Sequence, residues 1–316
     1  MRVSSERAVN DADPRPPLPL LPPRPPHGHK GTFGTVVVVG GSHAGGRAMV
    51  GAPALAALGA LRAGAGLAKL VMPADLLPAG LTVCPSATGV GIPQTGGGSL
   101  DPGAAPQVLD SMLAGASAAV IGPGLGEGDV ERALSLRAVQ QDGVPVVVDA
   151  DAINNLAVLP DLFRDFHAPA ILTPHPGEFR RIGAALRISQ DPTDPAQRPH
   201  AAAELARRLG CVCVLKGAGT VVSDGIRTWT CARGHPCLAT AGTGDVLAGV
   251  VAGLVAQYAC GPMPKLSLFD AARIGVEAHA VAGERWASEH GAQAGLLAQE
   301  LAEQVPGALE AMRNPG

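Results

Sequence analysis

The 316-residue sequence predicts an α/β fold in three layers, with a mostly parallel central sheet between two layers of helices. Short runs that are apolar on both faces alternate with helical stretches, as expected for buried parallel strands. Glycine-rich and polar clusters follow these runs repeatedly, at the strand ends where open α/β sheets place their ligands. With 42 glycines and only 3% aromatic residues, the helices and the sheet should pack through small side chains.

The first half of the chain supplies most of the predicted strands. Their β-branched or apolar runs are Thr35–Val39, Leu67–Met72, Ala118–Ile121, Val144–Val148 and Ala170–Leu172. An Ala/Leu-rich helix is predicted near Gly51–Ala63. The stretch Cys84–Ser99 is rich in Gly, Pro and Thr, so we predict a loop there.

The rest of the chain adds one strand and a hairpin and then becomes helical. A helix near Pro199–Leu209 precedes a strand at Cys211–Leu215 and a hairpin from Thr220 to Thr230. Helices are predicted at the end of the chain over Thr243–Tyr258, Ser267–Glu289 and Gly295–Ala311.

The first 26 residues differ from the rest because most positions from Pro14 to Pro26 are proline. Proline fixes φ and removes a backbone donor, so segment 1–26 is predicted to be an extended, polyproline-like tail. It could bind a proline-recognising partner, but we favour a stiff lead-in to the folded part. Residues 27–316 are predicted to form a single domain.

Charge and cysteine usage exclude several classes of protein. The net charge is −3 and no Lys/Arg-rich run is present, so we expect no nucleic-acid partner. No apolar stretch reaches the ~20 residues that span a bilayer, and the sequence shows no export leader, so no membrane association and a cytoplasmic location are expected. The six scattered cysteines indicate free thiols, with Cys211 and Cys213 on one face of a strand and buried.

The strongest chemical signal is Gly242-Thr243-Gly244-Asp245, which opens an apolar helical run. A glycine-rich turn at a helix N-terminus forms an anion hole for phosphate, so Gly242, Thr243 and Gly244 are candidates for it. Asp245 would repel phosphate if anion binding were its only purpose. The presence of an acidic residue here is explained if Asp245 accepts a proton from a hydroxyl group that attacks phosphorus. The alternative is an ordinary N-cap.

Lys216-Gly217-Ala218-Gly219-Thr220 follows one apolar strand and precedes another. The segment lacks the spacing of a P-loop, but its lysine and glycines could hold the phosphates or ribose of a nucleotide. A plain hairpin turn is the competing interpretation.

Further candidates follow other strands. Asp149 and Asp151 stand two apart at a strand end, and Asp149 with Glu178 could hold a hydrated Mg²⁺, although helix capping is an equal alternative. His175 lies between two prolines near the same predicted edge, which favours ligand contact over a structural role. The turn that ends at Gly126 is predicted to line a ligand with backbone donors.

Together these segments resemble the ADP- or ATP-dependent NAD(P)H-hydrate dehydratases of the ribokinase-like superfamily. The resemblance runs from about His29 to the C-terminal helices. Its segments occur in family order: LRAGAGL (61–67), IGPGLG (121–126), DADAIN (149–154), LTPHPGE (172–178), LKGAGT (215–220) and AGTGDVLAG (241–249).

The resemblance implies a ribokinase-like three-layer α/β/α fold and a lyase that repairs hydrated nicotinamide nucleotides. It assigns Ala52, Gly126, His175 and Asp245 to the hydrated dinucleotide, NADHX or NADPHX, with Asp245 as the base. It assigns residues 216–220 and Gly244 to the nucleotide, for which we expect ADP, with ATP as the alternative. Mg²⁺ and a homotetramer are expected on the same ground.

The sequence departs from the family pattern in two respects. Ala241 replaces a glycine beside the anion hole, which matters if that position needs a positive φ. Many bacterial members carry an epimerase domain, whereas here only the proline-rich tail precedes the dehydratase segments. Action on the S epimer alone and a separate epimerase are therefore expected. The alternative activity is that of a ribokinase-like kinase of a small hydroxylated vitamin precursor or sugar.

Overall fold

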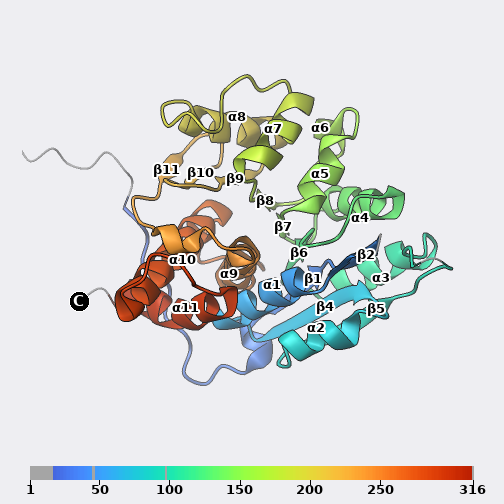
Figure 1. The fold of residues 1–316 in the computed structure, drawn as a ribbon, viewed down its shortest axis with the longest axis horizontal. Helices are drawn as coiled ribbons and strands as arrows, with labels where there is room; N and C mark the ends of the chain where they lie inside the picture. Colours follow the sequence, from blue (N-terminus) through green and yellow to red (C-terminus); the bar gives the residue numbers. More distant parts are fainter. Residues whose placement is uncertain (1–16, 45–46, 97, 315–316) are drawn as a thin grey trace, which may run out of the picture.

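The computed structural model describes residues 17–44, 47–96 and 98–314, which fold around one large sheet (Figure 1). The nine strands of this sheet follow one another in space in the order β11 (Thr228–Thr230), β10 (Val221–Ser223), β9 (Val212–Leu215), β8 (Ala170–Leu172), β7 (Val146–Val148), β6 (Ala118–Ile121), β1 (Thr35–Val39), β4 (Leu67–Pro73) and β5 (Thr88–Ile92). Neighbours from β5 to β9 pair in parallel, and the hairpin β10–β11 continues the sheet antiparallel to β9.

Two layers of helices cover the sheet, as predicted (Figure 1). One face carries α1 (Gly51–Arg62), α2 (Leu77–Val83), α9 (Thr243–Tyr258), α10 (Leu268–His290) and α11 (Ala298–Arg313). The other carries α3 (Ala104–Leu113), α4 (Asp129–Gln140), α5 (Asp151–Ala157), α6 (Leu162–Asp165), α7 (Pro176–Ala185) and α8 (Arg198–Leu209). Short elements complete the fold: the 3₁₀ turns η1 (Lys30–Phe33) and η2 (Pro236–Leu238) and the hairpin of β2 (Ser42–Ala44) and β3 (Arg47–Met49).

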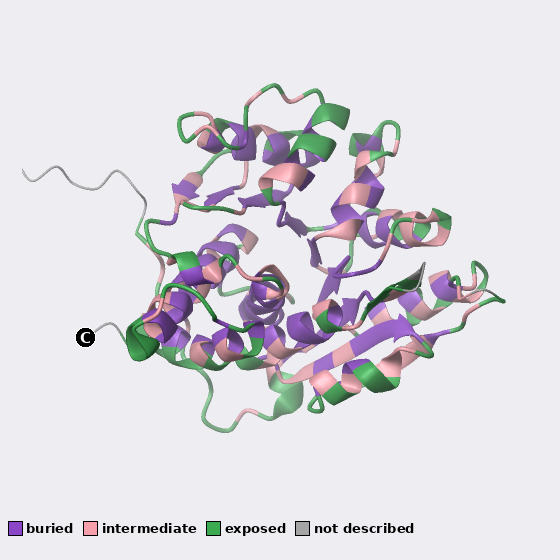
Figure 2. Cartoon of the chain, viewed as in Figure 1, coloured by how far each residue is buried: buried purple, intermediate pink, exposed green. Residues whose placement is uncertain are grey.

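Strand side chains alternate between the two layers, which is why both strand faces had to be apolar. Val36 and Val38 of β1 belong to the core beneath α1 and α9, whereas Val37 and Val39 belong to the core beneath α3 to α8. Figure 2 shows the result, with buried strands in the middle and exposed outer faces on the surrounding helices.

The predicted strands and helices are confirmed within a few residues of their bounds, with one error and several omissions. The predicted loop Cys84–Ser99 is wrong in its middle, because residues 88–92 form β5 and pair with β4. The sequence TGVGI has little strand propensity of its own. The omitted elements are mostly short: β2, β3, α2 to α7, and the two 3₁₀ turns.

Helices α1 and α9 are in backbone contact through glycines. A Cβ on Gly249 would lie 1.9 Å from the carbonyl oxygen of Ala56, and a Cβ on Gly59 would lie 2.5 Å from that of Val246. Any larger residue at either position would force the helices apart. This contact fixes α9, and therefore the turn at its start, against the body of the fold.

The described part of the proline-rich segment lies against the domain without regular secondary structure; residues 1–16 of the predicted tail lie outside the described residues. Leu21 is buried, and its N–H donates to the carbonyl of Met312 at 3.3 Å. Arg24 donates to the carbonyl of Gly64 at 2.8 Å and stacks 3.5 Å over the Phe33 ring. Among the helices described, none combines the length and apolarity needed to cross a bilayer.

Candidate active site

The predicted site residues that follow β7, β8 and β9 lie at one edge of the sheet, because these parallel neighbours end there together. Asp149 follows β7, and its Oδ1 accepts hydrogen bonds from the Thr173 hydroxyl after β8 and from the Lys216 ammonium after β9, each at 2.7 Å. Asp149 is only 1% exposed, so this pairing compensates for a buried charge.

Lys216 is the cation at the centre of an acidic cluster. Its Nζ lies 3.9 Å from Glu178 Oε2 in addition to its contact with Asp149. Burial acts to lower the pKa of Lys216, but Asp149 and Glu178 outweigh it and hold that pKa above its usual value. Lys216 is therefore a permanent positive charge at this edge.

The turn that opens α9 carries Asp245 into the same cluster. Gly242 adopts φ 90° at the N-cap, a conformation that favours glycine, and Asp245 lies in the first helical turn. A Cβ on Gly244 would lie 3.6 Å from Lys216 Nζ, so the turn predicted to form an anion hole and the lysine are adjacent. Burial, together with the negative charge of Asp149, raises the pKa of Asp245 to about 7.

Ala241 does not need the conformation that would have made it a strained substitute for glycine. The non-glycine residues of the described chain with positive φ are Ala150, Asp161 and Arg187. The positive φ of this turn is at Gly242. The departure from the family pattern is thus accommodated by the backbone.

A cavity of about 710 Å³ extends from Lys216 and Gly244 along α10. The predicted nucleotide segment 216–220 forms one wall, and residues of the loop 231–239 form another. Behind the first wall, the buried Arg198 guanidinium donates to the carbonyls of Leu215 at 3.0 Å and of Lys216 and Gly219 at 3.3 Å. Arg198 therefore fixes the backbone of the turn 216–220, and Gly217 and Gly219 of this turn line the cavity.

Gly126, a residue predicted to bind the hydrated dinucleotide, is held in place by two side chains of α5. Its N–H donates to Asp151 Oδ2 at 2.8 Å, and its carbonyl accepts from Asn155 Nδ2 at 2.9 Å. The prediction that this turn offers backbone donors therefore does not hold for the Gly126 N–H, which Asp151 already occupies. Ala52 of α1 lies near the same turn, because a Cβ on Gly124 would be 3.5 Å from the Ala52 Cβ.

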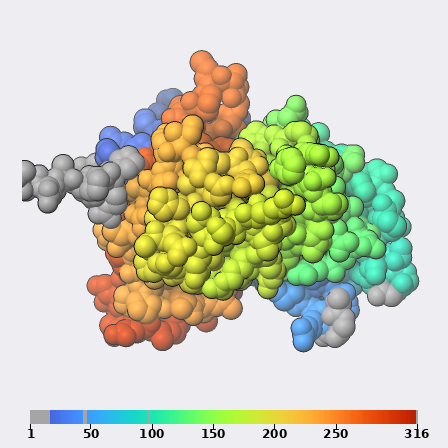
Figure 3. All heavy atoms as spheres, turned by 90° about the horizontal axis from the view of Figure 1, so that it is seen from above, coloured from blue at the N-terminus to red at the C-terminus, as the bar shows by residue number. Residues whose placement is uncertain are grey.

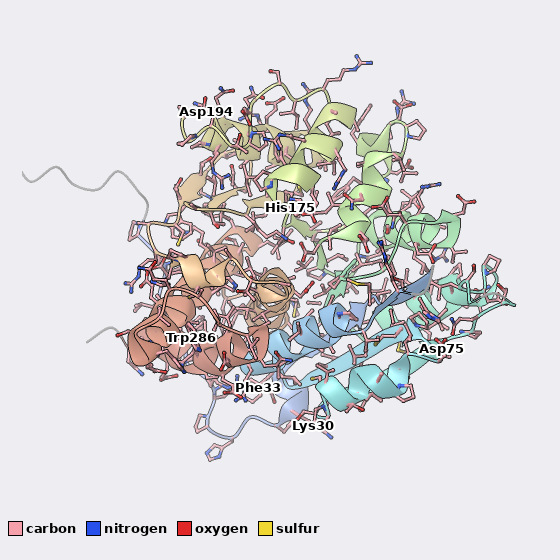
Figure 4. All side chains as sticks on the ribbon, in the orientation of Figure 1. Lys30, Phe33, Asp75, His175, Asp194 and Trp286 are labelled. Atoms are coloured by element: carbon pink, nitrogen blue, oxygen red, sulfur yellow. The ribbon has the colours of Figure 1, made fainter. Side chains whose placement is uncertain are left out.

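His175 is the N-cap of α7, near the middle of the molecule (Figure 4). Its Nδ1 accepts from the N–H of Gly177 at 2.8 Å and of Glu178 at 3.3 Å, and its Nε2 lies 3.3 Å from Glu178 Oε1. Burial and the nearby Lys216 lower the pKa of His175. The neutral ring with its proton on Nε2 satisfies all three contacts, and its half-exposed side chain still presents a face to a ligand.

The predicted pair for Mg²⁺, Asp149 and Glu178, does not fit direct coordination. Lys216 Nζ already lies between the two carboxylates. The described residues contain no group of three or more His, Cys, Asp or Glu side chains arranged to hold a metal ion. A divalent cation could therefore contact this pair only through its water shell.

Several residues that build the site have no recognisable signal in the sequence. Arg198 is one arginine in an unremarkable helix, Asn155 directly follows the segment 149–154, and Thr173 lies within the segment 172–178 without having been singled out. The sequence marks Asp151 only as a partner of Asp149. In the structure Asp151 has a role of its own, because its carboxylate accepts a hydrogen bond from the Gly126 N–H, and burial raises the pKa of Asp151. The strained Ala150 between them, at φ 49° and ψ −124°, turns the two carboxylates to different partners.

Comparison with known proteins identifies the family. The family model of NAD(P)H-hydrate dehydratases matches residues 36–307. The chain belongs to this family. The ADP-dependent (S)-NAD(P)H-hydrate dehydratase of Xanthomonas campestris is 35% identical over 285 residues, which cover 90% of each chain. A bifunctional NAD(P)H-hydrate repair enzyme of Coxiella burnetii is 38% identical over 274 residues, 86% of this chain and 50% of that enzyme.

The chain thus spans about half the length of the bifunctional curated relatives it matches. Among solved structures, the ADP/ATP-dependent NAD(P)H-hydrate dehydratase of Bacillus subtilis, co-crystallised with ATP/Mg²⁺, is 32% identical, with a TM-score of 0.74 and coverage of 93% and 95%. A hydroxyethylthiazole kinase of Pyrococcus horikoshii, 18% identical with a TM-score of 0.53, shares the fold. The predicted ribokinase-like α/β/α fold is confirmed.

Proposed function

We propose that this chain dehydrates the S epimers of hydrated NADH and NADPH and converts ADP to AMP and phosphate in the process. The observation that carries the proposal is the position of Asp245. It is a partly buried carboxylate with a pKa of about 7 in the first turn of α9, and the residue before it, Gly244, lines the cavity together with Lys216. Such a group can take a proton near neutral pH from a hydroxyl that attacks phosphorus.

The first step is phosphoryl transfer to the ring hydroxyl of the hydrate. Asp245 accepts the hydroxyl proton while the oxygen attacks the β-phosphorus of ADP, and the bond to the bridging oxygen breaks to leave AMP. Lys216 and the N–H groups at the start of α9 stabilise the negative charge that develops on the transferred group. Asp149 and Thr173 keep the Lys216 ammonium aimed at this place.

The second step is elimination. The lone pair of the ring nitrogen expels the phosphorylated oxygen as inorganic phosphate, and loss of a proton from the adjacent ring carbon restores the dihydropyridine. Phosphorylation drives the reaction because phosphate leaves far more readily than hydroxide. Ala52, Gly126 and His175 are the residues we assign to the hydrated dinucleotide, and none of the three lines the cavity.

The family relationship favours this activity over the kinase alternative, since the fold alone is shared by both. The tetramer, the cytoplasmic location and the reliance on a separate epimerase stay predictions. Mg²⁺ is proposed to accompany the nucleotide phosphates, as ATP/Mg²⁺ accompanies the Bacillus subtilis relative. Asp149 and Glu178 would contact its water shell, while proton and phosphoryl transfer depend on Asp245 and Lys216.

The proposal is tested by incubating hydrated NADH with the protein and either ADP or ATP, and following the return of absorbance at 340 nm. We expect recovery with ADP, release of AMP and phosphate, and a loss of about 10²- to 10⁴-fold in kcat for Asp245→Asn. Phosphorylation of a hydroxymethyl substrate by ATP without hydrate repair would favour the kinase. Unchanged turnover by Asp245→Asn would show that another group is the base.

A further inference from the structure

His279, in the middle of α10, lines the nucleotide cavity but takes no part in proton or phosphoryl transfer. Its Nε2 lies 2.9 Å from the carbonyl oxygen of Thr243, the first residue of α9. The ring therefore bridges α10 to the turn that carries the anion hole.

The contact with Thr243 defines which ring nitrogen carries the proton. A carbonyl oxygen only accepts, so Nε2 must be the donor, and in the neutral ring Nδ1 then keeps a free lone pair. Burial lowers the pKa of His279 to about 4, so the ring is neutral under ordinary conditions. Within the described chain, no donor is hydrogen-bonded to His279 Nδ1, and the side chain is only partly buried.

His279 lines the part of the cavity that adjoins the start of α9. The same ring touches Thr243, and the positive charge of Lys216 contributes to its low pKa, so both phosphate-binding elements are near. Its neighbours on α10 that face the cavity, Val276 and Ala280, are apolar. A nucleoside diphosphate at neutral pH carries donors only on its ribose hydroxyls and its adenine amino group, and of these the ribose adjoins the phosphates.

We propose that His279 Nδ1 accepts a hydrogen bond from a ribose hydroxyl of the bound nucleotide and so selects ribonucleotides. The inference rests on the nucleotide half of the proposed function and is independent of the fate of the hydrate. Because the opposite nitrogen holds Thr243, the same ring joins recognition of the sugar to the position of the anion hole.

The test is calorimetric binding, without hydrated dinucleotide, of ADP, 2′-deoxy-ADP, 3′-deoxy-ADP and inosine diphosphate. We expect the wild-type protein to bind one of the deoxy compounds about 3- to 10-fold more weakly than ADP. His279→Phe should bring that ratio close to one. His290→Gln is the matched control, because His290 lies on the same helix and bonds to the carbonyl of Trp286, outside the cavity; it should keep the wild-type ratio.

A second measurement does not depend on whether His279→Phe folds. In ¹⁵N NMR of the wild-type protein, the His279 Nδ1 resonance should have the position of an unprotonated nitrogen and shift with ADP, but less with the discriminated deoxy compound. Three results would each overturn the inference. The first is that His279→Phe still binds the deoxy compound more weakly than ADP by the wild-type factor. The others are that the substitution changes only the affinity for inosine diphosphate relative to ADP, or that the wild type does not bind ADP. Intact discrimination without hydrate turnover would instead refute the proposed activity and leave the inference standing.

Discussion

The substitution Asp245→Asn should stabilise the fold while it slows turnover. The folded protein holds the Asp245 pKa at about 7, against an ordinary value of 3.8. The folded chain therefore holds the carboxyl proton about a thousandfold more tightly than the unfolded chain, and each factor of ten corresponds to about 1.4 kcal/mol. The ionised carboxylate accordingly costs the wild-type protein about 4 kcal/mol of folding free energy. Asparagine keeps the shape and removes the charge, so up to this amount is recovered.

The pH dependence of the effect follows from the direction in which the pKa moves. Below pH 3.8 the carboxyl is protonated in both the folded and the unfolded chain, and the raised pKa has no consequence. Between that value and about 7 the unfolded chain releases a proton that the folded chain keeps, so wild-type stability falls as pH rises. The advantage of Asp245→Asn should grow across this window and become constant above it.

Urea denaturation at pH 5 and pH 8 measures this prediction, with the two proteins compared at each pH. Asp129→Asn is a suitable control, because Asp129 also lies in the first turn of a helix but its side chain is 97% exposed. The control should change stability by no more than about 0.5 kcal/mol at either pH. An Asp245→Asn protein that is less stable than wild type at pH 8, or equally stabilised at both pH values, would refute the reasoning.

Four further outcomes are expected. Since Asp245 must be ionised to act, kcat/KM for the hydrate should be about tenfold lower at pH 6 than at pH 8, and a flat pH–rate profile would contradict this. Lys216→Met should weaken ADP binding roughly 10- to 100-fold in calorimetry and cost about 3–5 kcal/mol in urea denaturation, because Asp149 is left buried and unpaired. Arg198→Met should raise the KM for ADP about tenfold and leave the KM for the hydrate unchanged, since its hydrogen bonds go to residues 215–219 and to the carbonyl of Pro192 and not to the residues assigned to the hydrate; equal effects on both would argue against that separation. Ala150→Gly should stabilise the protein by about 1 kcal/mol in thermal unfolding by relieving φ 49°, whereas a destabilised variant would mean that the strain is not local.

Most of the sheet was predictable because most of its strands have a local sequence signal. Five consecutive β-branched or apolar residues, as in Thr35–Val39, fit only a buried strand, and the glycines that follow mark its end. Strand β5 has no such signal: two of its five residues are glycine, and its pairing with Met72 and Pro73 of β4 stabilises it instead. Local sequence carries no information about that partner.

The site was predicted as a set of segments but not as a network. From the sequence, Asp149, Glu178 and Lys216 were expected at one edge, and the two carboxylates were offered a hydrated Mg²⁺. In the structure Lys216 contacts both carboxylates directly, from a position 67 residues away from Asp149 along the chain. Which cation neutralises a buried carboxylate depends on which strands are neighbours, and strand order is a property of the whole fold.

The two walls of the cavity differ in how much regular secondary structure supports them. Residues of α7 and α8 belong to the yellow-green to yellow surface at the centre of Figure 3, and these helices cover the outer face beside β8 and β9. The other wall, the loop 231–239, is exposed from Ala232 to Gly234, and its regular structure consists of the short turn η2. The two walls of the nucleotide cavity therefore have different mechanical support.

The glycine contact between α1 and α9 sets which parts of the protein can move during a catalytic cycle. Because the carbonyl of Ala56 fills the space above Gly249, α9 cannot slide or rotate against α1 without separating two backbones. Any opening and closing around a nucleotide is therefore expected in the loop 231–242 and in the turn 216–220, while Asp245 stays fixed. Hydrogen exchange should accordingly be slow throughout α9 and fast in the loop, and ADP should slow it in the loop and in the turn but not in α9.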